Sequence, residues 1–432
     1  MSTSPAPEAR IEAQLAASPA AREARDALAA VADAWIVGGS VRDALLGRAV
    51  EEVDIVVPDG EERAARTLAG EAGADVFVLS ESYAAWRVLG PGGEWQVDVA
   101  RMRGHGIGED LEARDFTINA MAIPLVGGDL LDPFDGLRDL DESRVRAVRR
   151  DSFDADPLRV LRAARLGAQL GFRIGDGTVA LARQCARRIA DIAAERAFAE
   201  LRLLVTGPDP LRGFELLDLL GATRFALPEF EGRERPLAVL QRVAELERDP
   251  GTLFAELDPA LAEFLAEPLA DWLSRGGALR FGALFHTLDR ADIRSLARRL
   301  HFSRKLTRHL ELLAHHHARL GSLAGQAPLD RRAIFEYLTA TRPAALDVTL
   351  LATAADPSLS SLARELAAEA LAWRRDGPPV APIRGDELAK ELGIEEGPEL
   401  GRLLHELAAA SYAGEIATPA DAIALARRLH TK

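Results

Sequence analysis

The sequence predicts an α+β region at the N-terminus followed by an all-helical remainder. The first observation is a series of short apolar runs, joined by short turns, up to about residue 140. Runs of this length that are bounded by Gly, Pro and Asp are typical of strands. The second is a helical spacing of apolar residues that begins at Leu158 and Leu161. The third is that almost no alternating strand pattern follows, so the fold class changes once along the chain.

The composition is that of a folded protein with full-sized cores. The chain has 432 residues, of which 48% are apolar and 28% charged, and a formal net charge of −14. That length corresponds to roughly two to four domains. The acidic balance argues weakly against a protein that coats nucleic acid indiscriminately, and it leaves room for a local basic groove. The single cysteine, Cys185, excludes an intramolecular disulfide and a cysteine-based zinc cluster.

No segment has the pattern of a membrane span or a secretion signal. No run approaches the roughly 20 apolar residues that cross a bilayer. The first 23 residues mix charges throughout and lack an apolar core, so no signal peptide is expected. We therefore expect a soluble, cytoplasmic protein with no membrane partner.

Strand and helix signals alternate in the N-terminal part. Trp35-Ile36-Val37 predicts a short strand that ends at Gly38-Gly39, and Ser40 is placed to cap a helix that runs to Leu46. The other expected elements are helices over 24–34 and 61–72 and strands over 53–57, 75–79, 85–89 and 95–99. Beyond residue 155 we expect a series of short helices, with a hinge at Gly377-Pro378-Pro379.

The sharpest chemical signal is the strand that ends in Gly38-Gly39, with Glu52 and Asp54 following on the next strand. Two glycines let the backbone approach a ligand closely, and the start of the following helix is a natural seat for phosphate. Arg42 can add a charge-assisted fork to a phosphate oxygen. Glu52 and Asp54 are two residues apart and so share one face of their strand. Carboxylates beside a phosphate seat suit Mg²⁺, whereas each feature taken singly is more often a plain turn or a solvated face.

Four motifs, in order, resemble those of the class II tRNA nucleotidyltransferase and bacterial poly(A) polymerase family. They are GGSVRDALLGR with EVDIVV (38–57), RDFTINAMA (114–122), DPFDG (132–136) and DPLRVLRAAR (156–165). The stretch 397–429 is also similar to the C-terminal end of that family, so the resemblance spans nearly the whole chain. It implies a nucleotidyltransferase head of the DNA polymerase β type, with a mixed sheet, followed by a helical neck, body and tail.

The resemblance also implies boundaries for these parts. They are a flexible N-terminal segment (1–23), a catalytic head (24–148), a neck that carries the nucleotide-selecting helix (149–206), a body (207–376) and an RNA-binding tail (380–432). Some relatives carry a His-Asp metal pair in the body, where this chain has His286-Thr287, so the body is expected to be a degenerate form of that domain.

Roles follow from the resemblance, position by position. Gly39 and Arg42 would contact the nucleotide, Arg114 would lie near its sugar and phosphates, and Glu52 and Asp54 would be ligands for two Mg²⁺ ions, for which Mn²⁺ could substitute. Asp98, on the strand 95–99, is a candidate third catalytic carboxylate. The residues implied for the nucleotide-selecting helix are Asp156 and Arg159 at the base edge, with Arg162 and Arg165 further along.

The spacing of these last four residues supports the assignment independently. Positions 156, 159, 162 and roughly 165 follow i, i+3 steps and so form one stripe of a helix. An acceptor and a fork of donors can match the edge of cytosine or adenine. Without the upstream motifs, a solvated helix face with an ion pair would be the preferred interpretation.

The sequence leaves the family pattern at three positions. Glu52 stands where the family has Asp, Ala113 where a second Arg is frequent, and Ala155 where Glu is frequent. The function we expect is template-independent addition of CCA, from CTP and ATP, to the 3′ end of tRNA. The alternatives are a poly(A) polymerase, an enzyme that adds only CC or only A, or a catalytically weakened RNA-binding protein.

The role of Glu52 as a metal ligand can be tested by substitution. Its extra methylene displaces the carboxylate by on the order of 1 Å, and Mg²⁺ demands near-ideal octahedral geometry. A misplacement of that size at a reacting centre can cost about 10²-fold in rate. We predict that Glu52→Asp keeps or raises single-turnover CTP incorporation, and that Glu52→Gln loses most of it in both Mg²⁺ and Mn²⁺. A Glu52→Gln protein as fast as the wild type in both metals would show that Glu52 is not a ligand.

Overall fold

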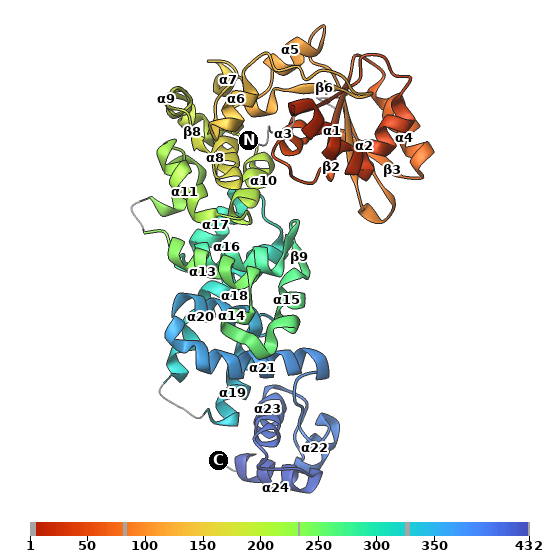
Figure 1. Ribbon diagram of the computed structural model, residues 1–432. Helices are drawn as coiled ribbons and strands as arrows, with labels where there is room; N and C mark the ends of the chain where they lie inside the picture. The colour runs from red at the N-terminus through yellow and green to blue at the C-terminus, as the bar shows by residue number, and fades with distance from the viewer. Residues whose placement is uncertain (1–5, 81–83, 232–233, 325–328, 431–432) are drawn as a thin grey trace. The chain divides into compact units, whose positions relative to one another are not determined.

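The computed structural model describes residues 6–80, 84–231, 234–324 and 329–430 (Figure 1). The chain divides into two compact units. Unit 1 comprises residues 1–204 and 212–226, and unit 2 comprises residues 205–211 and 227–432. The finer division into head, neck, body and tail stays a prediction. Within the described ranges, none of the helices is both long enough and apolar enough to cross a membrane.

Unit 1 is built on a mixed six-stranded sheet with the order β3-β4-β5-β2-β1-β6. The strands are β1 (Trp35–Val37), β2 (Glu52–Val57), β3 (Asp75–Ser80), β4 (Ala85–Leu89), β5 (Gln96–Arg101) and β6 (Ala122–Pro124). Only β2 and β5 pair in parallel, and the other neighbours are antiparallel. The predicted mixed sheet is therefore confirmed, and each predicted strand overlaps an observed one.

Alternation along β2 separates the core from the face that carries the carboxylates. Val53, Ile55 and Val57 are at most 1% exposed, while Glu52 and Asp54 lie between them in the pleat and point to the other face. Helices α2 and α4 pack side by side against β2, β4 and β5. One face of β2 is therefore fully buried, while the other carries Glu52 and Asp54 next to the buried Val56.

The predicted helix over 24–34 overlaps an observed helix only at 24–28, and the described part of the expected flexible segment, 1–23, is largely helical. Helix α1 spans Pro7–Ala17 and α2 spans Pro19–Leu28. Ile11 and Leu15, one helical turn apart, are fully buried, and α1 packs against α3. Ser18 caps α2 by accepting from the Ala21 amide, and it also donates to the Val50 carbonyl. Apolar residues spaced by four therefore order this segment despite its many charges.

The remainder of unit 1 is helical apart from one short ladder of two strands. Its α-helices are α3 (Gly39–Leu45), α4 (Glu61–Ala72), α5 (Ile107–Glu112), α6 (Gly136–Asp141), α7 (Ser152–Ala155), α8 (Leu158–Leu170), α9 (Asp176–Cys185), α10 (Ala194–Val205), α11 (Pro210–Leu219) and α12 (Thr223–Ala226). The short strands are β7 (Arg144–Val145) and β8 (Arg173–Ile174), and the 3-10 helices are η1 (Pro91–Gly93), η2 (Thr117–Asn119) and η3 (Ala186–Asp191).

The described residues of unit 2 are helical, as predicted, with one added hairpin. Its α-helices are α13 (Leu237–Arg248), α14 (Gly251–Phe254), α15 (Asp258–Ala266), α16 (Arg275–Phe285), α17 (Arg290–Arg299), α18 (Arg304–His316), α19 (Arg331–Thr341), α20 (Ala345–Ala355), α21 (Ser360–Asp376), α22 (Gly385–Leu392), α23 (Pro398–Tyr412) and α24 (Pro419–His430). Strands β9 (Pro268–Ala270) and β10 (Leu273–Ser274) form the hairpin, and the 3-10 helices are η4 (Pro228–Phe230), η5 (Ala255–Leu257), η6 (His317–Arg319), η7 (Gly321–Leu323) and η8 (Pro357–Leu359). Helix α16 is central, since every residue from Gly276 to Phe285 is buried.

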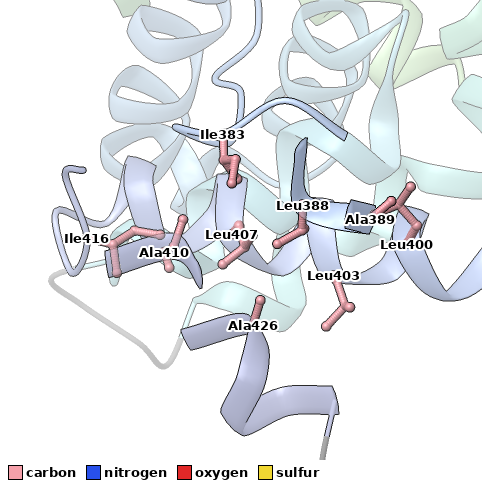
Figure 2. Close-up of a cluster of buried hydrophobic side chains, with 10 residues drawn as sticks. Ile383, Leu388, Ala389, Leu400, Leu403, Leu407, Ala410, Ile416 and Ala426 are labelled. Atoms are coloured by element: carbon pink, nitrogen blue, oxygen red, sulfur yellow. The ribbon is translucent and has the colours of Figure 1, made fainter. Parts of the chain in front are cut away.

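The last three helices of unit 2 share an apolar core of their own (Figure 2). Leu388 of α22 and Leu407 of α23 are fully buried in it. Three aromatic rings join this core to the preceding helices: Phe335 of α19 and Trp373 of α21 lie 5.6 Å apart, and Tyr412 of α23 lies 5.6 Å from Trp373. Edge-to-face contacts between aromatic rings therefore hold α23 against α19 and α21.

Candidate active site

The turn from β1 into α3 brings a glycine, a guanidinium and a carboxylate together. Gly38 has a φ of 73°, a conformation that favours glycine. A Cβ at this position would lie 2.7 Å from a guanidinium nitrogen of Arg114 and 3.4 Å from a carboxylate oxygen of Asp54. Gly38 is thus the residue whose missing side chain makes room for the site. Gly39, the predicted contact, is the first residue of α3.

Ser40 has a different role from the one predicted for it. It lies inside α3, and Gly38 takes the capping position. Its hydroxyl accepts from the Asp54 amide at 2.9 Å and donates to the Glu52 carbonyl at 3.2 Å. Helix α3 is therefore pinned to β2 at the two predicted metal ligands.

The carboxylates come from neighbouring strands. In the parallel β2–β5 pair, Asp54 is opposite Asp98, and Glu52 is opposite Gln96. Both oxygens of Asp98 accept from Arg87 of β4, at 2.8 Å each. Arg87, which sequence analysis missed, therefore balances one of the two adjacent charges.

Asp54 is left in an unfavourable electrostatic position. Burial, followed by the negative charges of Asp98 and Glu52, raises its pKa to about 6, although Arg114 and Arg42 pull in the opposite direction. A divalent cation would relieve both the repulsion and the loss of solvation. Among the residues that the structure describes, no group of three or more His, Cys, Asp and Glu is arranged to hold a metal. The carboxylates gathered at Asp54 fit an ion that binds one or two carboxylates and completes its coordination shell with water and substrate phosphates, as Mg²⁺ does.

Two arginines line this face of the sheet. Arg42 is buried and donates to both oxygens of Asp43 and to the side-chain oxygen of Asn119, the last at 2.7 Å. Arg114 is held by Asp110, with its Nη2 at 2.9 Å from Oδ2. Both guanidinium groups act electrostatically on Asp54, so the site combines a carboxylate with arginines, which suits a metal-bound polyphosphate.

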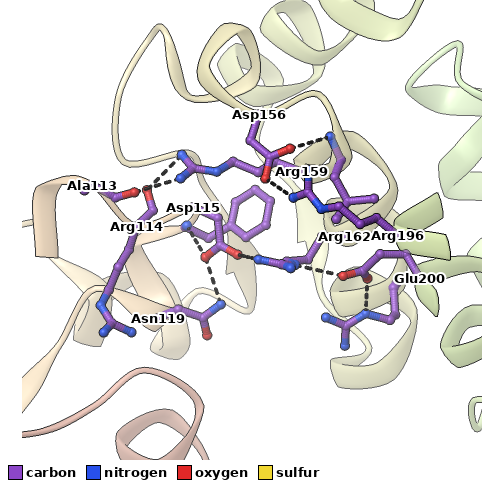
Figure 3. A network of polar contacts seen from close by, with 12 residues as sticks. Ala113, Arg114, Asp115, Asn119, Asp156, Arg159, Arg162, Arg196 and Glu200 are labelled. Atoms are coloured by element: carbon purple, nitrogen blue, oxygen red, sulfur yellow. Dashed lines mark hydrogen bonds and ion pairs between the residues drawn. The ribbon is translucent and has the colours of Figure 1, made fainter. Parts of the chain in front are cut away.

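Helix α8 is tied to the segment that carries Arg114 (Figure 3). Arg159 donates to the carbonyl of Ala113 at 2.7 Å and to that of Arg114 at 3.2 Å. Asp156 precedes the helix, where one oxygen accepts from the Leu158 amide at 3.2 Å and the other pairs with Arg196 at 2.7 Å. The two predicted base-reading groups are therefore adjacent, and each has a protein partner.

The other two arginines of the stripe have structural partners. Arg162 bridges Asp115 at 3.1 Å and Glu200 of α10 at 3.0 Å, and Arg165 pairs with Glu200 at 2.6 Å (Figure 3). Burial alone would raise the pKa of Asp115, but Arg162 and the Asn119 amide hold it below its ordinary value. Because Asn119 also accepts from Arg42, an unbroken polar chain runs from α3 to α10.

The structure gathers six of the predicted residues on one face of the sheet: Gly39, Arg42, Glu52, Asp54, Asp98 and Arg114. It connects Arg159 to them through the carbonyls of residues 113 and 114, whereas Asp156 pairs with Arg196, and Arg162 and Arg165 turn toward Glu200. Asp115 and Asn119 belong to the motif RDFTINA, so the signal was present, but their role becomes visible only through the long-range pairing.

Two family models match the chain. One, described as a poly A polymerase head domain, matches residues 34–106 and 93–146. The other, described as a probable RNA and SrmB-binding site of polymerase A, matches residues 171–232. Together they cover the strands that carry the carboxylates and the helices that follow α8.

Relatives match over most of their length. The chain is 34% identical over 394 residues to a CC-adding tRNA nucleotidyltransferase of Geobacter sulfurreducens, with 90% of each chain covered. It is 32% identical to an A-adding tRNA nucleotidyltransferase of Deinococcus radiodurans, over 91% of this chain and 95% of that one. A solved tRNA nucleotidyltransferase, complexed with a primer tRNA and an incoming ATP analog, is 25% identical, with a TM-score of 0.62 over 82% of this chain and 99% of that one. The chain therefore belongs to the family of tRNA nucleotidyltransferases and bacterial poly(A) polymerases.

The crowded position of Asp54 generates a stability prediction for the metal-free protein. The pKa of about 6 in the folded state exceeds the value of about 3.9 expected for an unfolded chain. The folded state therefore binds more protons between these values, and its stability falls as the pH rises through that window. We predict that Asp54→Asn, measured by urea unfolding in EDTA at pH 7.5, is more stable than the wild type by about 1–3 kcal/mol.

Two comparisons check this prediction. The advantage of Asp54→Asn should shrink at pH 5, where the wild-type carboxyl is mostly protonated. Asp98→Asn should be less stable than the wild type at pH 7.5, because it leaves Arg87 without its charged partner. Equal stabilities of Asp54→Asn and wild type at both pH values would contradict the electrostatic account.

Proposed function

We propose that this protein adds nucleotides to the 3′ end of tRNA without a template, completing or repairing CCA from CTP and ATP. The observation that carries the proposal is the placement of Asp54 beside Asp98, next to Gly38, Arg42 and Arg114, on the sheet of a family whose members are nucleotidyltransferases. A tRNA substrate agrees with the cytoplasmic location that the sequence predicts.

In the proposed reaction, the 3′-hydroxyl oxygen of the RNA attacks the α-phosphorus of the incoming nucleotide. A bond forms between that oxygen and the α-phosphorus, the bond from the α-phosphorus to the bridging oxygen breaks, and pyrophosphate leaves. The hydroxyl proton passes to water. The site must therefore neutralise the negative charge that builds up on the pyrophosphate.

Different residues are proposed to bind the metal, to stabilise the triphosphate and to leave space for the nucleotide. Glu52 and Asp54, with Asp98 adjacent, would hold Mg²⁺, or Mn²⁺ in its place. Such ions, when bound, activate the attacking hydroxyl and neutralise the leaving group. Arg42 and Arg114 place fixed positive charge beside the triphosphate. The turn at Gly38-Gly39 leaves space for the nucleotide to approach the backbone.

Asp156 and Arg159 are proposed to select the base. A carboxylate acceptor next to an arginine fork can complement the edge of cytosine or adenine. In this structure Asp156 pairs with Arg196, and Arg159 donates to the carbonyls of residues 113 and 114. Pairing with a base would exchange these partners, so nucleotide entry and a shift of α8 relative to the segment 113–114 would occur together.

Addition of only CC or only A is a second candidate, and a specific observation favours it. Among relatives that match about nine-tenths of this chain, those at 34% and 32% identity are named for CC addition and A addition, and one from Streptococcus sanguinis at 28% is named a CCA-adding enzyme. Two relatives from Pseudomonas putida, 37% identical over about half of this chain, are named a CCA-adding enzyme and a multifunctional CCA protein. The expectation of CCA addition and this alternative differ in the RNA ends that they extend.

The test uses tRNA that lacks its last one, two or three nucleotides, incubated with CTP, ATP or both in Mg²⁺. Complete addition predicts extension of all three substrates to the full CCA end. A CC-adding enzyme would stop after two cytidines, and an A-adding enzyme would extend only the tRNA that already ends in CC. Long homopolymeric adenosine tails would indicate a poly(A) polymerase, and no extension of any end would refute the proposed function.

Base selection generates a further prediction. Arg159→Ala removes the donor fork and should change the relative incorporation of CTP, ATP, UTP and GTP by about tenfold or more, while the affinity for tRNA stays within about twofold. The control is Arg149→Ala, because Arg149 is exposed and pairs with exposed Asp151. Unchanged nucleotide preference with weakened tRNA binding would assign Arg159 to RNA contact instead.

A further inference from the structure

The hairpin of unit 2 presents a tryptophan to solvent. Asp271 and Trp272 form the two-residue turn between β9 and β10, and their φ values are 52° and 62°. Turns with two such residues strongly favour Asn-Gly or Asp-Gly. A bulky residue in this conformation is a genuine outlier. Trp272 is nonetheless 92% exposed, so the turn displays a large ring without burying it.

The tip of the hairpin is fixed in place. A carboxylate oxygen of Asp271 accepts from the Ser303 amide at 2.9 Å. Ser303 in turn caps α18, because its hydroxyl accepts from the Leu306 amide at 3.1 Å. The turn is therefore anchored at the start of α18, and the position of Trp272 is set by a folded element.

A basic hollow of about 590 Å³ adjoins this anchor. Its lining includes Phe302 and Arg304, the two neighbours of Ser303 in the chain. The charged side chains that line the hollow are Arg294, Arg298, Arg304, Arg308 and Glu311, and His301 is also present. Four arginines thus face one glutamate, which pairs with Arg294. In a chain with a net charge of −14, this concentration of positive charge is local.

We propose that Trp272 and this basic hollow bind the RNA substrate, with the indole stacked on an unpaired base and the arginines on the flanking phosphates. The inference rests on the proposed function, which supplies a structured RNA. Single-stranded parts of RNA are recognised through bases stacked on aromatic side chains, next to positive charge that follows the backbone. The arginines of the hollow favour a polyanion as the ligand, and the exposed ring of Trp272 favours a polyanion that carries bases.

The first experiment replaces the ring. Trp272→Gly supplies the residue that the turn favours, so the melting temperature should equal or exceed that of the wild type. Loss of one stacking contact should weaken tRNA binding by about tenfold, measured by filter binding, and raise the KM for tRNA similarly. Trp272→Tyr should stay close to wild type. The KM for CTP and the rate at saturating tRNA should not change in either variant.

The second experiment separates phosphate contacts from stacking. The slope of the logarithm of affinity against the logarithm of salt concentration reports the number of phosphates neutralised. The double variant Arg304→Ala/Arg308→Ala should reduce that slope by about 1–2, whereas Trp272→Gly should leave it unchanged. Arg22→Ala, an exposed arginine of α2 in unit 1, serves as the control and should leave affinity and slope unaltered.

The outcomes separate this inference from the proposed function. A wild-type protein that extends tRNA, with Trp272→Gly and the double variant both binding tRNA as tightly as the wild type, would overturn the inference alone. The same unchanged tRNA binding with lost affinity for an acidic polypeptide such as poly-glutamate would also overturn it, in favour of a protein partner. A wild-type protein that neither binds nor extends tRNA would refute the proposed function itself.

Discussion

Repulsion between Asp54 and Asp98 is the constraint on which the rest of unit 1 depends. Parallel pairing of β2 with β5 places the two carboxylates opposite one another. Arg87 compensates Asp98 with two hydrogen bonds, but burial of Asp54, together with the charge of Asp98, still raises the pKa of Asp54 to about 6. Gly38, which has no side chain, lets Arg114 approach the same point. The surroundings of Asp54 thus favour a cation, and a site of this kind is destabilising until an ion and a polyanionic substrate arrive.

The segment that follows α5 joins this carboxylate pair to α8. Arg114 faces Asp54 through its side chain, while its carbonyl accepts from Arg159. Asp115 pairs with Arg162 and, through Asn119, connects to Arg42. The groups proposed to contact the triphosphate and those proposed to contact the base therefore share hydrogen-bond partners. A change at one end of this series of hydrogen bonds alters the partners that are available at its other end.

Local patterns predicted much of the fold, and they predicted the residues that the structure gathers around Asp54, whose roles stay a prediction. The apolar strand 53–57 and the glycines before α3 were recognisable because their signals lie within a few residues of one another. The partners of the site residues were not recognisable from the sequence. Arg87, Glu200 and Arg196 are distant from those residues in sequence and come close only when strands pair and helices pack. The role of Gly38 was not predictable for a related reason, since its positive φ and the approach of Arg114 cannot be inferred from two consecutive glycines. Helix α1 was missed because its charges outnumber Ile11 and Leu15, the buried pair that orders it.

The most direct test of the central claim is Mn²⁺ binding, followed by electron paramagnetic resonance in the presence of CTP. The account predicts that the wild type binds Mn²⁺ with CTP, and that Asp54→Asn weakens this binding by at least about tenfold while remaining folded. Equal Mn²⁺ affinity in the two proteins would show that Asp54 is not a metal ligand. The carboxylate pair would then need a different explanation.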